Sequence, residues 1–262
     1  MGFADKYGPW AVVLGASEGL GEAYARGLAA RGLSVVVAAR REAPLRRVAD
    51  AIATEHGVET RAVPLDLASP DFLDGLRTVT DDLDVGLVIY NGAASYVGPF
   101  LDGAESFAAI VAVNCVGPLV VCQHFGRHLV DRGRGGIVLM GSAAGLAGSP
   151  HISAYAASKA FDLVLGEALW AEWRDKGVDV MAVIGPAIDT PTYRNSLPAE
   201  TRATLPTPMD PVDVVTEVFD ALGTDPSFAP GEMGERLAML GRLPRRQQVE
   251  AMARAQAELS KG

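Results

Sequence analysis

Short apolar segments of strand length alternate with longer amphipathic segments along most of this chain. The apolar segments, such as WAVVLG at 10–15 and VGLVIYN at 85–91, carry almost no polar residue on either face. Strands of this kind are typical of a parallel sheet that helices cover on both sides. Strands are expected at 10–15, 34–40, 60–66, 85–91, 135–141 and 178–185, and helices near 19–31, 42–56, 69–81, 104–131, 153–176 and 211–222. This order predicts an α/β fold with a doubly wound parallel sheet.

No break in composition divides the chain, so one Rossmann-type domain over residues 1–262 is expected. Two regions interrupt the alternation. Residues 186–210 hold five prolines and little periodicity, and a loop this long in a compact domain is usually a functional lid or disordered. We expect a lid over a substrate site. Residues 224–262 show no clear strand and predict a loop followed by a helix from about 244 to 259.

Composition excludes several classes of partner. The formal net charge is −9, with 49% apolar residues among 262, and a strongly acidic chain suits neither nucleic acid nor an anionic membrane. The two cysteines, Cys115 and Cys122, are too few for a disulfide scaffold and are expected as reduced core thiols. No apolar run approaches the roughly 20 residues of a membrane helix, and the N-terminal stretch MGFADKYGPW lacks the core of a signal peptide. A cytoplasmic protein is therefore expected.

The segment GASEGLG follows the first expected strand and opens the first expected helix. It places Gly15, Gly19 and Gly21 where a tight turn and close backbone approach are needed. The N-terminus of the helix offers free N–H groups to a phosphate. The spacing differs from the common G-x-G-x-x-G pattern, and a glycine turn can serve only to join a strand to a helix. In this position, we favour the binding of a dinucleotide.

The second expected strand ends in AARR, at the edge where a ribose would lie. An acidic residue there would bind the 2′-hydroxyl of NAD, but Arg40 and Arg41 follow Ala39 instead. Arginines suit a 2′-phosphate through their charge and forked donors, so NADP(H) is the predicted cofactor. Alternatively, one arginine of the pair is only a solvated residue at the end of the strand. Since Glu18 adds no positive charge, the preference for NADP(H) over NAD depends mainly on Arg40. Asp66 is expected either to hold the adenine or to serve as a cap or turn residue.

Tyr155 and Lys159 stand four residues apart in SAYAASKAF, on one face of an expected helix. Taken alone, such a pair is most often two surface side chains that bury their apolar parts and expose their polar ends. The reduction of a ketone needs an acid beside the carbonyl oxygen. A tyrosine, with an unperturbed pKa of about 10, needs a nearby positive charge to exchange a proton at neutral pH. Lys159, one helical turn along, can supply that charge.

Together these motifs resemble the short-chain dehydrogenase/reductase family over about residues 8–222. The resemblance depends on the glycine loop, Asn91-Gly92-Ala93, Asn114, Ser142 thirteen positions before Tyr155, the Tyr155–Lys159 pair and Thr190. It implies an NADP(H)-dependent oxidoreductase that interconverts a secondary alcohol and a ketone. The start of the chain, the ARR strand end and the helical tail are also similar to NADP-dependent bile-acid hydroxysteroid dehydrogenases of bacteria.

The resemblance implies roles for individual residues. Tyr155 would act as acid or base, with Lys159 tuning it and binding the ribose hydroxyls. Ser142 would hydrogen-bond the substrate oxygen, and Asn114 would support a proton relay to Lys159. Taken alone, a serine such as Ser142 is most often a strand-end or cap residue. An asparagine such as Asn114 is most often a buried amide whose hydrogen bonds are satisfied. The implied cofactor contacts are Gly15, Ser17, Gly19, Leu20, Gly21, Arg40, Arg41, Asp66, Leu67, Asn91, Gly92, Ala93, Tyr155, Lys159, Ile188 and Thr190.

Three positions depart from the family's usual pattern. Leu14 stands where a threonine is common, Asn91-Gly92-Ala93 replaces Asn-Ala-Gly, and Gly185-Pro186 reverses Pro-Gly. The expected effects are a lost turn hydrogen bond and a changed local path of the loop before Thr190.

The substrate pocket is expected above the carboxyl ends of the strands. Residues 94–100, 143–151, Tyr193 and Met209 should line it, and most are small or apolar. This favours an apolar alcohol or ketone, steroid-like or 3-oxoacyl. The tail helix would close this pocket, the pocket of a neighbouring subunit, or simply pack on the fold. A homodimer or homotetramer is expected. We favour the subunit interface over the core as the place of an apolar stripe: Phe161, Leu165, Leu169 and Trp173.

Other functional classes find less support. His124 and His128 have zinc-ligand spacing, but no third ligand stands nearby, so no metal is predicted. The chain has neither a P-loop lysine nor a Gly-x-Ser-x-Gly motif, which disfavours phosphoryl transfer and serine hydrolysis. The alternative to an oxidoreductase is a catalytically silent dinucleotide-binding sensor or scaffold of the same fold. A dehydratase or epimerase would need further acid/base groups and a larger substrate domain.

Overall fold

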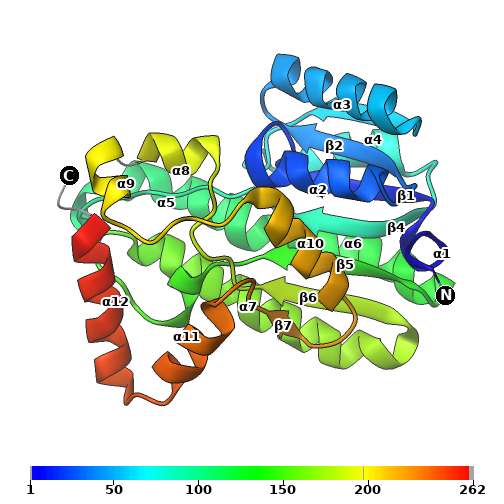
Figure 1. The fold of residues 1–262 in the computed structure, drawn as a ribbon. Coiled ribbons are helices and arrows are strands. Elements are labelled where there is room, and N and C mark those ends of the chain that lie inside the picture. The colour runs from blue at the N-terminus through cyan, green and yellow to red at the C-terminus, as the bar shows by residue number, and fades with distance from the viewer. Residues whose placement is uncertain (1, 197, 260–262) are drawn as a thin grey trace.

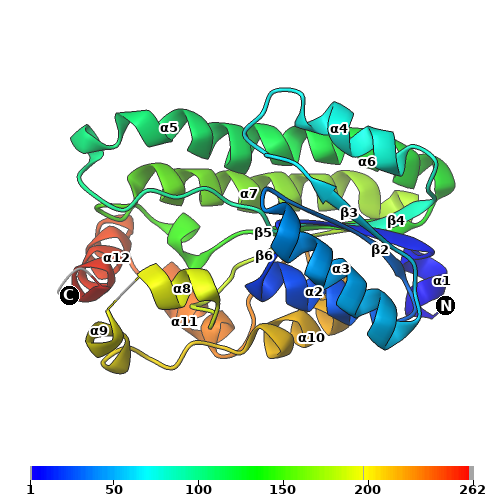
Figure 2. The same cartoon turned by 90° about the horizontal axis from the view of Figure 1, so that it is seen from above.

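The computed structural model describes residues 2–196 and 198–259. In this part of the chain, parallel strands form one sheet in the order β3-β2-β1-β4-β5-β6-β7, and helices cover both of its faces (Figures 1 and 2). The predicted doubly wound α/β fold is confirmed. The ends of the predicted domain and one position of the predicted lid, residues 1, 197 and 260–262, lie outside the described residues.

The strands are short and apolar because helices bury both sides of the sheet. Every residue of β1, β4 and β5 is buried. Each of the predicted strands is present and ends one or two residues earlier than expected. The predicted strands are β1 (Trp10–Leu14), β2 (Ser34–Ala39), β3 (Thr60–Pro64), β4 (Val85–Tyr90), β5 (Gly135–Met140) and β6 (Val178–Val183), and β7 (Ser227–Phe228) is a further strand.

The helices form two layers, one on each face of the sheet. α4, α6 and α7 pack on one face, and α2, α3 and α10 pack on the other (Figure 2). The bounds of the longer helices are α2 (Gly19–Ala29), α3 (Glu42–His56), α4 (Phe72–Thr80), α5 (Ala104–Val111), α6 (Gly117–Arg132), α7 (Ser153–Trp173), α10 (Pro211–Ala221), α11 (Met233–Gly241) and α12 (Arg245–Leu259). The shorter elements are α1 (Phe3–Tyr7), η1 (Phe100–Asp102), η2 (Ala112–Val116), η3 (Ala143–Leu146), η4 (Arg174–Lys176), α8 (Pro191–Ser196) and α9 (Ala199–Ala203).

The helical run Ala104–Arg132 joins α5, a π-helical turn (η2) and α6. It is 29 residues long and contains an 18-residue window with a mean hydropathy of 1.8, so by length and composition alone it could cross a membrane. The expectation that every apolar run is too short missed this, because polar residues interrupt the run in sequence without interrupting the helix. In the fold the run lies along the sheet (Figure 2), and Val121, Phe125 and Leu129 are buried in the core.

Two segments hold more regular structure than the sequence predicted. The proline-rich region contains α8 and α9. Its two ends are joined, because Asp189 N donates to Met209 O at 2.9 Å and Met209 N donates to Ala187 O at 2.9 Å. The prediction of a tail without a strand was wrong, since β7 pairs with β6 through Ala182 and Ser227. A two-residue strand has no periodicity to detect, and the open edge of β6 supplies its partner.

The apolar stripe of α7 faces the interior in part. Leu165, Leu169 and Trp173 are partly buried and pack against the core beside α6. The core interpretation of these three residues is therefore confirmed, and a subunit interface on the same helix stays a prediction.

Candidate active site

A cleft of about 730 Å³ opens at the carboxyl ends of the strands. Successive strands are added to one side of β1 up to β3 and to its other side from β4 onward, so the strand order reverses between β1 and β4. Open α/β sheets bind ligands at such a point. The volume lies in the range of small-molecule sites. The predicted cofactor residues line this cleft, except Gly21: Gly15, Ser17, Gly19, Leu20, Arg40, Arg41, Asp66, Leu67, Asn91, Gly92, Ala93, Tyr155, Lys159, Ile188 and Thr190.

The glycine loop has a backbone path that other residues would obstruct. Gly15 and Gly19 have φ of +85° and +59°, which is the left-handed region that favours glycine. Gly21 lies beneath the loop, where a Cβ would stand 2.0 Å from the Gly15 carbonyl oxygen. The N-cap residue Glu18 makes no side-chain hydrogen bond to the start of α2. The first amides of α2 thus stay available, and they fit a phosphate group.

Asn91 and Gly92 connect the end of β4 to this loop. Asn91 Nδ2 donates to the Gly15 carbonyl at 3.0 Å. A Cβ on Gly92 would stand 2.4 Å from Leu67 Cδ1, so glycine at this position leaves room for the Leu67 side chain. Together they fix the floor of the cleft between β1 and β4.

The two arginines after β2 have different surroundings. Arg41 pairs with Glu18 at 2.8 Å and donates to Ser17 Oγ at 3.3 Å. Arg40 is exposed at the rim of the cleft, and no ion pair engages it within the described residues. Arg40 therefore offers a cation for an anionic group at this end. Asp66 also lines the cleft, and its Oδ1 accepts a hydrogen bond from Ala68 N at 3.0 Å, as a turn residue does.

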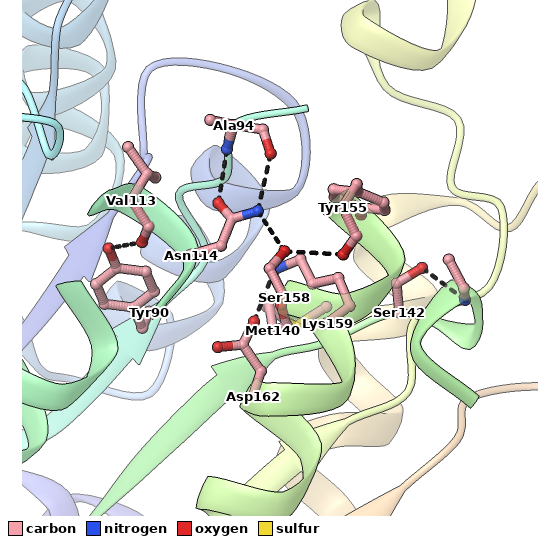
Figure 3. A network of polar contacts seen from close by, with 11 residues as sticks. Tyr90, Ala94, Val113, Asn114, Met140, Ser142, Tyr155, Ser158, Lys159 and Asp162 are labelled. Atoms are coloured by element: carbon pink, nitrogen blue, oxygen red, sulfur yellow. Dashed lines mark hydrogen bonds and ion pairs between the residues drawn. The ribbon is translucent and has the colours of Figure 1, made fainter. Parts of the chain in front are cut away.

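Ser142, Tyr155 and Lys159 share one wall of the cleft (Figure 3). Ser142 follows β5, and its Oγ accepts a hydrogen bond from Ala144 N at 3.2 Å. Tyr155 lies in the first turn of α7, with its ring centroid 5.9 Å from Lys159 Nζ. A strand end and a helix start thus bring a hydroxyl, a phenol and an ammonium together.

The ammonium of Lys159 donates hydrogen bonds to two acceptors in the protein interior. Its Nζ donates to Met140 O at 2.7 Å and to Asp162 Oδ2 at 2.9 Å (Figure 3). Both side chains of the ion pair are only 3% exposed. Burial raises the pKa of the Asp162 carboxyl, and the Lys159 ammonium opposes that rise. Sequence reasoning missed Asp162, although an acid three residues after the lysine, on the apolar side of a helix, was a visible signal.

Asn114 does not line the cleft; it ties three segments together behind it. Its Oδ1 accepts from Ala94 N at 2.8 Å, and its Nδ2 donates to Ala94 O at 2.8 Å and to Ser158 Oγ at 2.9 Å. It lies in the π-helical turn η2, where the Tyr90 hydroxyl donates to Val113 O at 2.5 Å (Figure 3). The interpretation of Asn114 as a satisfied buried amide is confirmed, and its relay role stays a prediction.

The segment after β6 reaches over the cleft. Thr190 packs on the glycine loop, since a Cβ at Gly19 would stand 3.1 Å from the Thr190 side chain. Thr190 Oγ1 also accepts from Tyr193 N at 3.1 Å and so starts α8. Arg194 is bound to Asp189 through two hydrogen bonds of 2.7 and 2.6 Å. The guanidinium of Arg194 is thus engaged within its own segment.

The tail helix contacts its own chain beside the site. Arg245 Nη1 donates to Leu146 O at 2.7 Å, and Leu146 ends the short helix that follows Ser142. Figure 1 shows α12 on the same side of the molecule as α8 and α9. The tail is therefore placed next to the predicted substrate pocket of the same subunit.

The cysteines and histidines singled out in the sequence lie away from the cleft. Cys115 and Cys122 are free thiols, and burial raises the pKa of Cys122 to about 12. His124 and His128 lie beside carboxylates, with Nε2 3.6 Å from Asp81 and 3.1 Å from Asp84 respectively.

Comparisons with known proteins match most of the chain. The family model described as short chain dehydrogenase matches residues 9–201. The chain is 34% identical over 235 residues to a 7beta-hydroxysteroid dehydrogenase of Clostridium sardiniense, covering 89% of each chain. It is also 34% identical over 227 residues to a very-long-chain 3-oxoacyl-CoA reductase of Aspergillus clavatus, covering 85% of this chain and 65% of that one.

Solved structures agree with these sequence matches. A structure described with the stereoselectivity of 7beta-hydroxysteroid dehydrogenase superposes with a TM-score of 0.90 at 30% identity, covering 96% of this chain and 99% of the other. A short-chain dehydrogenase from Sphingobium yanoikuyae in complex with NADPH gives a TM-score of 0.74 at 27% identity, covering 90% of this chain and 97% of the other.

Proposed function

This chain belongs to the short-chain dehydrogenase/reductase family and is an oxidoreductase of that family, and from that premise we propose its reaction. It interconverts an apolar secondary alcohol and its ketone with NADP(H). One observation carries the proposal: Ser142, Tyr155 and Lys159 share a wall of the cleft whose floor is the glycine loop. The side chains that would act on an alcohol or ketone and the glycine loop that would bind a dinucleotide thus line the same cleft.

The cleft has donors suited to each part of the cofactor. The free amides at the start of α2 would hold the pyrophosphate, and Arg40 would hold the 2′-phosphate. Lys159 would hold the ribose hydroxyls, and Thr190 the carboxamide. When bound, the nicotinamide would supply or accept the hydride. The NADPH bound by the Sphingobium yanoikuyae relative supports this choice.

The residues of this chain would handle the proton and the substrate oxygen. Ser142 would donate a hydrogen bond to that oxygen and so orient it toward Tyr155. The phenolic oxygen of Tyr155 would give its proton to the oxygen in reduction and take it back in oxidation. The Lys159 ammonium favours the phenolate that remains after the proton has left. Asn114 would act from behind the wall, by fixing Ala94 and Ser158.

An apolar substrate is favoured by two segments next to the cleft, which Ala94 and Ser142 line. The segment after β4 and the loop before α7 meet where Gly98 N donates to His151 O at 2.8 Å. On the first of these segments, Val97 and Phe100 are more than half exposed. Exposed apolar side chains beside a polar reaction centre suit an apolar ligand. The names of the relatives support a steroid or a 3-oxoacyl compound as that ligand.

The assembly and location of the protein stay predictions. A homodimer or homotetramer is supported by apolar side chains exposed on neighbouring helices: Val111 on α5, Leu119 on α6 and Val164 on α7. A cytoplasmic location is the corresponding expectation from the sequence.

A substrate panel followed by NADPH absorbance tests this function. The panel holds 7-oxosteroids, 3-oxoacyl thioesters and small polar ketones, each assayed with NADPH and with NADH. We expect turnover of an apolar ketone with NADPH and little turnover of the polar ones. Tight NADPH binding without turnover of any panel member would support the silent sensor or scaffold instead.

A further inference from the structure

Lys159 and Asp162, which lie one turn of α7 apart, form an ion pair inside the protein. The Nζ–Oδ2 distance is 2.9 Å, and each side chain is 3% exposed. Removing two charges from water is costly unless good geometry and further hydrogen bonds compensate. Lys159 meets this condition because it also donates to Met140 O. Asp162 does not, because its buried Oδ1 has no hydrogen-bond partner among the described residues.

The groups that face Asp162 from neighbouring elements are uncharged at neutral pH. They are Tyr90 on β4, Cys115 in η2 and Cys122 on α6. Burial raises the pKa of all three. Within the described residues, Lys159 is the positive charge that opposes the carboxylate. A carboxylate held so deeply, with one oxygen unpaired, calls for a role beyond packing.

The pair limits what the lysine can do in the cleft. An ammonium has three N–H donors, and two of them are used by Asp162 Oδ2 and Met140 O. One donor remains on a side chain that lines the cleft. Asp162 therefore fixes where that donor is available, before any ligand enters.

We propose that Asp162 is a positioning residue for the reaction: it anchors the ammonium of Lys159 in the cleft wall and keeps it charged while Tyr155 exchanges its proton. This rests on the proposed function. Asp162 touches neither Tyr155 nor the cleft and acts only through Lys159.

The pH profile of Asp162→Asn tests this role, because asparagine keeps the size and removes the charge. Ketone reduction needs a proton on Tyr155 and a charge on Lys159. Without the carboxylate, the ammonium is less stable, and any ammonium that persists favours the phenolate more strongly. Both effects lower the pH above which reduction fails. With a 7-oxosteroid and saturating NADPH, we expect the alkaline limb of kcat to move down by about one pH unit. An unchanged limb overturns the proposal.

Glu167→Gln is the matched control. It also changes a carboxylate to an amide on α7, about two turns beyond Lys159, where Glu167 accepts from Ser227. Its pH profile should equal that of the native protein. NADPH binding, followed by quenching of protein fluorescence, gives a readout apart from turnover. We expect Asp162→Asn to weaken it by roughly threefold to tenfold, because the Lys159 donor is no longer fixed.

A double-mutant cycle of thermal unfolding tests the pair without any reaction. Lys159→Met leaves a buried carboxylate alone, and Asp162→Leu leaves a buried ammonium alone, so each should lower the unfolding midpoint. The double variant should recover much of that loss. Additive losses would show that the pair does not form in solution and would overturn the proposal. If Asp162→Leu does not fold, Asp162→Asn replaces it in the cycle. If no ketone of the substrate panel is turned over but the double-mutant cycle shows that Lys159 and Asp162 interact, the proposed function is refuted and the ion pair is not.

Discussion

At the scale of single residues, the two arginines after β2 separate into different roles. Arg41 is engaged by Glu18, whereas Arg40 is exposed at the rim of the cleft. We therefore expect Arg40→Asp to weaken NADPH binding by roughly tenfold to a hundredfold, since a charge-assisted hydrogen bond is lost and a repulsion gained. NADH binding should stay equal or improve. Titration of both cofactors by fluorescence measures this.

The control for that substitution is Arg46→Asp, which makes the same change of charge on α3, where Arg46 pairs with Glu42. It should leave both affinities near those of the native protein. Equal affinities of the native protein for NADPH and NADH would contradict the assignment of Arg40.

Residues whose role depends on local spacing could be predicted from sequence. Gly15, Tyr155 and Lys159 belong to motifs within one turn or one helix, and the structure places them in one cleft. Asp162 could not be assigned in the same way, because its role depends on burial. Which arginine is engaged depends on the rotamer of Glu18, and that too is set by the fold.

At the scale of elements, Asn114 joins the π-helical turn η2 to α7 and to the segment after β4. Its amide makes three hydrogen bonds, to both backbone groups of Ala94 and to Ser158. Asn114→Ala should lower the free energy of unfolding by roughly 2–3 kcal/mol, because it leaves buried polar groups unpaired. Denaturant unfolding measures this. Asn195→Ala, at an exposed position of α8, should change stability little. Equal effects of the two substitutions would exclude this joining role.

The longer elements followed from hydrophobic periodicity, and the short ones did not. α3 begins and ends as predicted, at Glu42 and His56, because an amphipathic helix that ends at a glycine carries its own signal. β7 spans only Ser227–Phe228, and its pairing depends on the edge of β6. α8 and α9 lie in a proline-rich segment, where Pro191 and Pro198 stand at their starts. Proline is well suited to a first helical turn. The prediction of a loop took these prolines only as helix breakers.

At the scale of the whole molecule, the sheet brings distant segments of chain to one edge. The glycine loop follows β1, Ser142 follows β5 and Thr190 follows β6, and each lines the same cleft. Alternation of strands and helices predicted that convergence, since parallel strands end on one side. The position of α12 beside η3 could not be predicted, because it depends on long-range contacts such as the hydrogen bond from Arg245 to Leu146.

The central claim is that this cleft reduces a ketone with NADPH and a proton from Tyr155. The direct measurement compares the native protein with Tyr155→Phe, using a 7-oxosteroid and NADPH, while cofactor binding is followed by fluorescence. The native protein should turn the steroid over, and the variant should lose roughly 10²–10⁴-fold in kcat with NADPH affinity nearly unchanged, because only the proton donor is removed. A variant that reduces the steroid at close to the native rate would contradict the account.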